Sequence, residues 1–172
     1  MKKKIALIGY GVIGKRVADA IARQDDMELA GVCDVISDWR IQAAVKKGYP
    51  VYAATEDASG YMQKAGIPLA GNMADLLGVA HLVVDCTPKK IAAQNVKIYK
   101  EQGIKFILQG GEKHETTGHS FSAENNYASA LNRDSTRVVS CNTTSILRTL
   151  TALNKVGLLQ SARGTQLRRA TE

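Results

Sequence analysis

The pattern of hydrophobic and polar residues changes repeatedly along the chain between the period of strands and that of helices. Short apolar runs predict buried strands, and apolar residues that recur about every three to four positions predict helices. In 12–23, for example, Ile13, Val17 and Ile21 share one helical face. The predicted strands are 4–8, 27–32, 49–53, 82–85, 105–108, 137–139 and 166–171, and the predicted helices are 12–23, 38–47, 91–102 and 142–155.

The alternation of strands and helices predicts a parallel sheet with helices on both faces. Because crossovers between parallel strands are right-handed, the sheet should be doubly wound, in an α/β fold of the Rossmann type. Two stretches interrupt the alternation. Residues 55–71 contain three glycines and Pro68, and 114–126 are polar, so we expect both to be surface loops.

Length and composition are those of an ordinary globular domain. The chain has 172 residues, of which 45% are apolar and 23% charged, and such a chain can bury one hydrophobic core. Its apolar runs are strand-length, well below the roughly 18 residues of a membrane span. The basic start at 1–5 is followed by Gly9, Gly11 and Gly14, which argues against a signal peptide. We therefore expect a cytoplasmic protein with no membrane partner.

The cysteines and the charge narrow the classes of ligand. Cys33, Cys86 and Cys141 form no CxxC pair and have no metal-ligand spacing, so neither a disulfide framework nor a metal site is expected. The net charge is +7, and the basic residues are scattered rather than interleaved with aromatic ones. A phosphate-carrying ligand explains this charge better than nucleic acid does.

The segment 9–14, Gly-Tyr-Gly-Val-Ile-Gly, is the GxGxxG fingerprint of dinucleotide-binding folds. It follows a predicted strand and opens a predicted helix, which is the context the fingerprint requires. Gly9 allows the tight turn, Gly11 lets a pyrophosphate approach the backbone, and Gly14 lets the helix pack on the sheet. The N–H groups at the start of the helix favour the phosphates. A glycine-rich turn without a ligand is the alternative.

Asp34 stands at the end of the second predicted strand, 20 residues after Gly14. A carboxylate there accepts hydrogen bonds from the adenosine ribose and repels a 2′-phosphate, which favours NAD over NADP. The alternative is that Asp34 caps its own turn through Ser37. The basic residues Lys2–Lys4, Arg40 and Lys46 leave the cofactor preference open.

Two further loops follow predicted strands at the same edge of the sheet. Cys86-Thr87-Pro88 follows 82–85, and Gln109-Gly110-Gly111 follows 105–108. Ligands of doubly wound sheets bind at the carboxyl ends of the strands. Thr87, Gly110 and Gly111 are therefore candidates for contacts with the cofactor, with ordinary turn chemistry as the alternative.

Cys141 is the candidate nucleophile. It follows the strand predicted at 137–139 and stands at the start of a helix that Asn142 or Thr143 can cap. The helix dipole and the free N–H groups stabilise a thiolate there, and the same N–H groups can stabilise an oxyanion. Attack on an aldehyde followed by hydride transfer would give a thioester. The alternative is a buried inert thiol, which is what we expect of Cys33 and Cys86.

The sequence offers no evident base to activate Cys141. His114 and His119 lie in the polar stretch 114–126 and are expected to be solvated, so the base should come from a segment outside this chain. Arg168 and Arg169 lie in the last predicted strand. Two arginines near an active site suit a phosphate, and a solvated basic end is the alternative.

The glycine turn and the cysteine segment together resemble the archaeal-type (class II) phosphorylating glyceraldehyde-3-phosphate dehydrogenases. The similarity extends from residue 3 to the end of the chain. It rests above all on the QGGEKHE loop at 109–115 and the SCNTT segment at 140–144. Other similar stretches are IALIGYGVIGKRVADAI, QDDMELAGV, LVVDCTP, YKEQGIKFIL and TRVVS.

The resemblance implies an activity and a set of site residues. The reaction is the NAD(P)-dependent oxidation of glyceraldehyde 3-phosphate, with inorganic phosphate, to 1,3-bisphosphoglycerate through a cysteine thioester. The family is tetrameric and cytoplasmic, serves glycolysis or gluconeogenesis, and often accepts NADP as well as NAD. Carried over to this chain, the nucleophile is Cys141, the substrate-binding residues are Ser140, Cys141, Asn142 and Arg168, and the cofactor-binding residues are Val12, Ile13, Gly111 and Arg169 together with the glycines of the turn.

The chain departs from the family in several places. It has Ile8 where the family usually has asparagine, Val12 where it has threonine, and Asp34 where it commonly has a lysine for the 2′-phosphate. The last of these favours NAD. The resemblance also predicts a dinucleotide-binding domain at 1–140, and at 141–172 only the nucleophile helix and first strand of an α+β catalytic domain. We therefore expect an N-terminal part of the enzyme with little activity by itself.

Two other functions stay open at this point. Semialdehyde and acyl-phosphate dehydrogenases share the glycine turn and the cysteine nucleophile, although their cysteine segments differ from SCNTT. A non-catalytic NAD-binding module with a redox-sensitive Cys141 is the other alternative.

Overall fold

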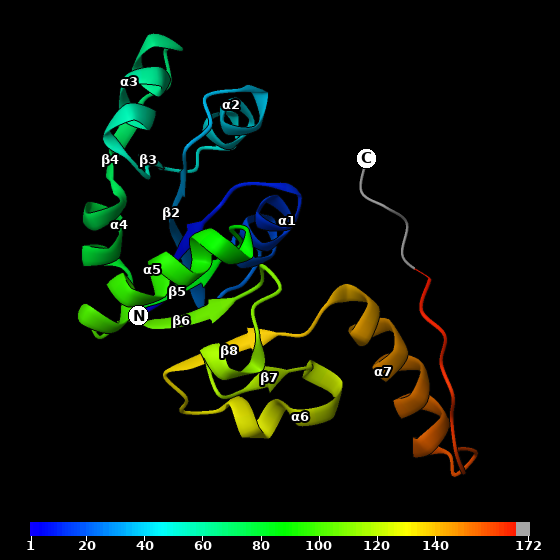
Figure 1. The fold of residues 1–172 in the computed structure, drawn as a ribbon. Helices are drawn as coiled ribbons and strands as arrows, with labels where there is room; N and C mark the ends of the chain where they lie inside the picture. Colours follow the sequence, from blue (N-terminus) through cyan, green and yellow to red (C-terminus); the bar gives the residue numbers. More distant parts are fainter. Residues whose placement is uncertain (168–172) are drawn as a thin grey trace.

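The computed structural model describes residues 1–167, and these residues contain eight strands in a single parallel sheet with the order β4-β3-β2-β1-β5-β6-β8-β7 (Figure 1). The strands are β1 (Lys3–Ile8), β2 (Met27–Asp34), β3 (Val51–Ala53), β4 (Leu69–Asn72), β5 (Leu82–Asp85), β6 (Lys105–Leu108), β7 (Ser120–Phe121) and β8 (Ser135–Val138). The order reverses direction at β1, between β2 and β5. This is the switch point of a doubly wound sheet, where ligands bind.

Seven α-helices connect and cover the strands in the described part of the chain. They are α1 (Val12–Ile21), α2 (Trp39–Lys46), α3 (Glu56–Lys64), α4 (Met73–Val79), α5 (Lys89–Glu101), α6 (Ala123–Ala130) and α7 (Cys141–Lys155). A short 3₁₀ turn, His114–Thr116, precedes β7. The predicted doubly wound α/β fold is therefore confirmed.

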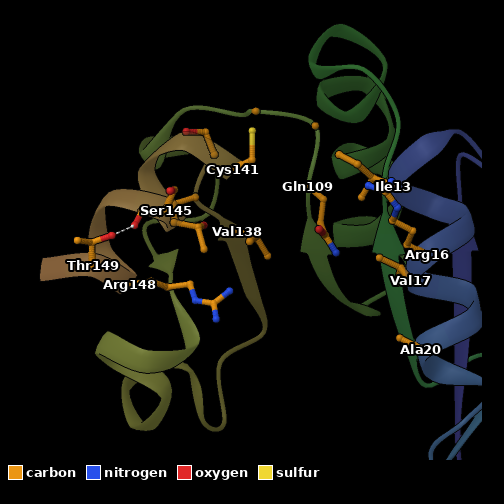
Figure 2. Close-up of a pocket in the computed structure, with 15 residues that line it drawn as sticks. Ile13, Arg16, Val17, Ala20, Gln109, Val138, Cys141, Ser145, Arg148 and Thr149 are labelled. Carbon is orange, nitrogen blue, oxygen red and sulfur yellow. Dashed lines mark hydrogen bonds between the residues drawn. The ribbon is translucent and has the colours of Figure 1, made fainter. Parts of the chain in front are cut away.

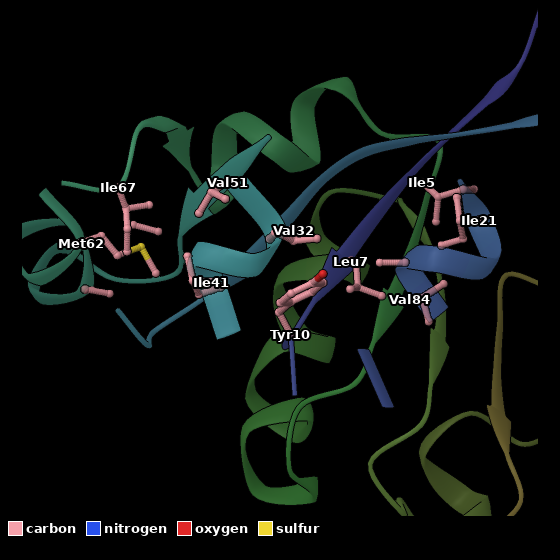
Figure 3. Packing of buried hydrophobic residues seen from close by; sticks show 14 residues of the cluster. Ile5, Leu7, Tyr10, Ile21, Val32, Ile41, Val51, Met62, Ile67 and Val84 are labelled. Atoms are coloured by element: carbon pink, nitrogen blue, oxygen red, sulfur yellow. The ribbon is translucent and has the colours of Figure 1, made fainter. Parts of the chain in front are cut away.

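The core is divided between the two faces of the sheet because successive side chains of a strand point to opposite faces. Leu7 of β1 belongs to the cluster that α1, α2 and α3 cover, as Figure 3 shows, and the next residue, Ile8, belongs to the cluster under α4 and α5. Both are almost fully buried. The continuous apolar run of β1 thus serves two cores.

The stretch predicted as a loop at 55–71 is instead helix α3 and most of strand β4. Thr55 caps α3 by accepting a hydrogen bond from Ala58 N at 3.2 Å, and Met62 is buried. The helix tolerates Gly60 because one glycine in a helix costs only about 1 kcal/mol, which the burial of Ala58 and Met62 offsets. The glycine content of 55–71 was therefore a misleading guide.

The prediction for 114–126 was also wrong in part. This stretch contains β7 and the start of α6, and His119 is buried rather than solvated. Its two ring nitrogens contact Thr136 Oγ1 at 2.6 Å and Ser129 Oγ at 2.9 Å. His114 is exposed, as predicted.

Burial of His119 predicts that the protein loses stability in mild acid. Burial lowers the pKa of His119, and Arg133 and His114 lower it further. Below about pH 6.5 the unfolded chain takes up a proton that the folded chain resists, so stability falls as the pH drops from the unfolded towards the folded pKa. Urea unfolding at pH 7.5 and 5.5 measures this, with His119→Gln as control. An equal pH effect in the variant would contradict the assignment to His119.

Helix α7 differs from the other long helices because none of its residues is buried. It lies beside α6 and away from the central strands (Figure 1). Asn125 Nδ2 donates to Thr151 Oγ1 at 2.7 Å, and Arg148 Nε lies 3.6 Å from Glu124 Oε1. Residues 166 and 167 carry no regular secondary structure, and the rest of the strand predicted at 166–171 lies outside the described residues. Within residues 1–167, none of the helices has the length and apolar character needed to cross a bilayer.

Candidate cofactor and nucleophile site

The glycine turn lies at the carboxyl end of β1, and the space around each glycine shows why the turn needs that residue. Gly9 has a φ of +88°, and a Cβ there would lie 2.9 Å from Thr87 N. A Cβ at Gly14 would overlap Gly9 O, so α1 packs against the turn only because this residue is glycine. Around Gly11, by contrast, no atom of residues 1–167 lies within 4 Å of the Cβ position. The turn therefore has open space where a pyrophosphate would approach.

The N-terminus of α1 supplies donors beside this space. Gly11 is the N-cap of α1, and no side chain caps the helix. The first N–H groups of a helix have no partner within it and carry its positive dipole end. An uncapped start next to an open glycine backbone suits a phosphate-bearing ligand.

The turn opens on a cavity of about 460 Å³ at the carboxyl ends of β1, β2 and β5. Gly9, Gly11, Asp34 and Thr87 all line it, so the structure brings together four of the predicted cofactor residues. The remaining lining residues include Cys33, Val35, Ile36, Arg40, Cys86 and Pro88. Val12, another predicted cofactor residue, is exposed and does not line this cavity.

Asp34 joins the glycine turn to the loop after β2. Tyr10 N donates to Asp34 Oδ2 at 2.6 Å, and Val35 N donates to Oδ1 at 2.7 Å. Ile36 N is a longer donor to Oδ1 at 3.4 Å. The carboxylate does cap its own turn, through Val35 and Ile36 rather than through Ser37. These contacts fix its position at the rim of the cavity.

Asp85, a residue that the sequence reasoning did not single out, positions the loop that carries Thr87. It is fully buried at the end of β5. Thr87 donates to Asp85 Oδ1 through both N (2.8 Å) and Oγ1 (2.6 Å). Asn95 Nδ2 and Tyr99 Oη, both from α5, donate to Oδ2 at 2.9 and 2.7 Å. The only sequence feature that could have indicated this role of Asp85 is an acidic residue at the end of an apolar strand.

Glu112 is the second residue that the sequence reasoning missed. Its side chain is only 3% exposed, and neither carboxyl oxygen has a hydrogen-bond partner among the described residues. Burial raises the pKa of Glu112, and the Asp85 carboxylate adds to the rise. A Cβ at Gly110 would overlap Thr87 O and approach Glu112 Oε1, so Gly110 allows the two loops to pack together. Nothing in the polar QGGEKHE loop indicates such burial.

The nucleophile candidate, Cys141, is the first residue of α7 and is exposed. The cap of the helix is Ser140 rather than Asn142 or Thr143, since Ser140 Oγ accepts from Thr143 N at 3.2 Å. Asn142 Oδ1 lies 3.9 Å from Cys141 Sγ. The three predicted substrate contacts, Ser140, Cys141 and Asn142, therefore lie at the start of α7.

Cys141 lines a second cavity, of about 940 Å³, between α1 and α7. Figure 2 shows its sulfur across from Gln109 and from Ile13 and Arg16 of α1. Gly110 and Gly111 line the same cavity, and none of the described residues around it is a histidine. Arg16 and Arg148 also line it, although the sequence pointed instead to Arg168 and Arg169, which lie outside the described residues.

The other two cysteines are less exposed than Cys141: Cys33 is buried, as predicted, whereas Cys86 is only partly buried. Cys33 is buried, and burial, with the charges of Asp34 and Asp85, raises its pKa to about 12. Burial, followed by Asp85 and Glu112, likewise raises the pKa of Cys86 to about 12. Neither thiol ionises appreciably near neutral pH. Cys141 is the one exposed thiol of the three.

Comparisons with known proteins support the sequence resemblance. The chain is 48% identical over 170 residues to the glyceraldehyde-3-phosphate dehydrogenase of Methanothermus fervidus, covering 99% of this chain and 50% of that protein. It is also 48% identical over 172 residues to that of Methanosarcina mazei, covering 100% and 51%. These curated relatives confirm the predicted resemblance. The chain spans about half the length of the curated relatives it matches.

The solved aspartate semialdehyde dehydrogenase II of Vibrio cholerae is similar with a TM-score of 0.60 and 14% identity, over 90% of this chain and 47% of that one. At this identity the likeness concerns the fold. Residues 3–143 match the family described as dihydrodipicolinate reductase, N-terminus. That match includes the glycine turn, the switch point of the sheet and Cys141. The chain therefore belongs to this family of dinucleotide-fold domains.

Proposed function

We propose that this chain is the cofactor-binding and nucleophile-bearing part of a phosphorylating glyceraldehyde-3-phosphate dehydrogenase. The observation that carries the proposal is the position of Cys141. Its exposed thiol, at the start of α7, shares one cavity with Gly110, Gly111 and Ile13, next to the glycine turn. The names of the archaeal relatives supply the substrate.

The cofactor we propose is a nicotinamide dinucleotide, preferably NAD. The open space at Gly11 and the uncapped start of α1 fit its pyrophosphate, and Asp34 and Thr87 line the adjoining cavity. Asp34 would accept from the adenosine ribose and Gly111 would border the nicotinamide end. When bound, the nicotinamide accepts the hydride removed from the substrate.

The chemistry of the chain itself centres on Cys141. Its thiolate attacks the aldehyde carbon to form a thiohemiacetal, and the N–H groups at the start of α7 stabilise the oxyanion. Oxidation of this adduct leaves a thioester on Sγ. Inorganic phosphate then attacks the thioester carbonyl, which forms the acyl phosphate and releases the Cys141 thiolate. Asn142, whose Oδ1 lies 3.9 Å from Sγ, and Ser140, the N-cap of α7, would hold the substrate.

For the whole protein we propose a boundary between residues 140 and 141, after the dinucleotide-binding domain. The position of α7 supports it, because this helix lies away from the central strands of the sheet (Figure 1) and none of its fifteen residues is buried. A role in glycolysis or gluconeogenesis and a tetrameric assembly follow from the resemblance alone.

Alkylation of Cys141 tests this proposal. At pH 7 iodoacetamide should modify Cys141 at least about tenfold faster than it modifies a free cysteine thiol, because the thiolate is the reacting form. Glyceraldehyde 3-phosphate should slow that modification by occupying Sγ, whereas aspartate semialdehyde should not. Peptide mass spectrometry identifies the modified residue, and Cys141→Ser is the control.

The outcomes separate the candidate functions. Protection by aspartate semialdehyde alone would favour a semialdehyde dehydrogenase. Alkylation of Cys141 no faster than that of a free thiol, with protection by neither aldehyde, would overturn the role of Cys141 as nucleophile.

A further inference from the structure

Four charged side chains gather where the adenosine of a dinucleotide would lie, around the loop between β2 and α2. Asp34 and Arg40 line the cavity beside the glycine turn, together with Val35 and Ile36. Asp38 pairs with Arg40, and the Lys15 ammonium lies 4.5 Å from the centre of the Trp39 ring. Two carboxylates and two cations make this group neutral overall.

The guanidinium of Arg40 is held by Asp38. Arg40 Nε donates to both Asp38 oxygens, at 3.1 and 3.0 Å, and Nη2 donates to Oδ2 at 2.6 Å. Asp38 also caps α2, since its Oδ1 accepts from Arg40 N at 2.9 Å. The pair is partly solvated, with side chains 36% and 41% exposed. Arg40 therefore lies at the cavity with its Nε and Nη2 donors bound to Asp38, and its side chain remains partly accessible to solvent.

An adenosine ribose with free hydroxyls does not need Arg40 as a hydrogen-bond partner, because a carboxylate such as Asp34 accepts hydrogen bonds from these hydroxyls. A 2′-phosphate brings about two negative charges close to Asp34 and needs a cation, and an arginine fork is the group that suits it. In this chain the Asp38 carboxylate occupies the Nε and Nη2 donors of Arg40 and offsets its charge, so a phosphate that binds this edge of the guanidinium would have to displace Asp38. Asp38 and the phosphate would thus compete for the Nε and Nη2 donors of Arg40.

We infer that Asp38, by holding Arg40, is a specificity-determining residue that makes the chain discriminate against a 2′-phosphorylated adenosine. Asp34 repels the phosphate, and Asp38 engages Arg40, the cation of this group that lines the cavity. The inference rests on the proposed dinucleotide site. It predicts that loss of the Asp38 carboxylate, with Asp34 intact, turns Arg40 into a 2′-phosphate ligand.

The test compares NAD and NADP binding to the whole chain by isothermal titration calorimetry. Asp38→Ser removes the charge and keeps a side-chain oxygen that caps α2. We expect this variant to bind NADP about tenfold more tightly, the value of one charge-assisted hydrogen bond, and NAD within about twofold of the unmodified chain. The gain should shrink at high salt, since the pair is solvated.

The double variant Asp38→Ser/Arg40→Gln is the matched control and should lose the gain. A thermal unfolding curve of each variant verifies that it is folded. An unchanged ratio of NAD to NADP affinity in folded Asp38→Ser, or a gain that persists in the double variant, would overturn this inference while leaving the proposed function intact. If the unmodified chain bound neither dinucleotide, both would fail.

Discussion

Replacing Gly14 with alanine should destabilise the protein and abolish dinucleotide binding together. The added Cβ would overlap Gly9 O in the turn, and backbone cannot move aside as a flexible side chain can. Overpacking of this kind costs roughly 1–3 kcal/mol or more. Because the turn itself must shift, the N–H groups that face the pyrophosphate are displaced as well. Urea unfolding and calorimetric titration with NAD measure the two effects.

Gly11→Ala is the matched control for Gly14→Ala. Gly11 has a φ of −76°, which alanine adopts readily, and nothing lies within 4 Å of its Cβ position. This variant should keep its stability within about 0.5 kcal/mol and still weaken NAD binding, since the methyl group projects where the pyrophosphate would lie. A Gly14→Ala protein as stable as the unmodified chain would refute the packing argument.

Removal of the Asp85 carboxylate should produce the second large effect. In Asp85→Ala the Tyr99 hydroxyl, the Asn95 amide and the Thr87 N–H and hydroxyl lose their acceptor inside the protein. Donors left unsatisfied in the interior cost about 1–3 kcal/mol each, although relaxation reduces the sum, so we expect a loss of roughly 3–5 kcal/mol. Urea unfolding measures this loss of stability. Titration with NAD measures the weaker binding that we expect when the Thr87 loop is no longer held in place.

Asp85→Asn gives the graded comparison. The amide keeps one acceptor oxygen and replaces the other with a donor, so it can serve Thr87 or the pair of Asn95 and Tyr99 but not both. Its loss of stability should lie between zero and that of Asp85→Ala. A loss below about 1 kcal/mol in Asp85→Ala would show that water replaces the carboxylate and that Asp85 does not hold the loop.

Most of the fold was predictable because its signals are local. The strands 82–85 and 105–108 were predicted with their observed bounds, and α1 begins at Val12 as expected. A continuous apolar run indicates a strand that is buried on both faces, and a 3.6-residue period indicates a helix that is buried on one face. Both patterns can be recognised in the sequence. The errors at 55–71 and 114–126 arose where short elements combine polar residues and glycine with few buried positions, so that packing rather than pattern stabilises them.

The sequence by itself determined the chemistry that depends on residue type and spacing. The glycines of the turn, Asp34 at the end of a strand and Cys141 at the start of a helix were all identified from their neighbours in the chain. Only the tertiary structure could show that Asp85 holds the Thr87 loop, that Glu112 is buried with no partner among residues 1–167, and that Arg40 is engaged by Asp38 at the rim of the cavity. The contacts of Asp38 with Arg40 and of Asp85 with Thr87 join residues two positions apart, but the cavity that Arg40 and Thr87 line and the burial of Asp85 and Glu112 depend on loops that follow separate strands and meet at one edge of the sheet. That meeting is decided when the sheet assembles, and no local pattern in the sequence encodes it.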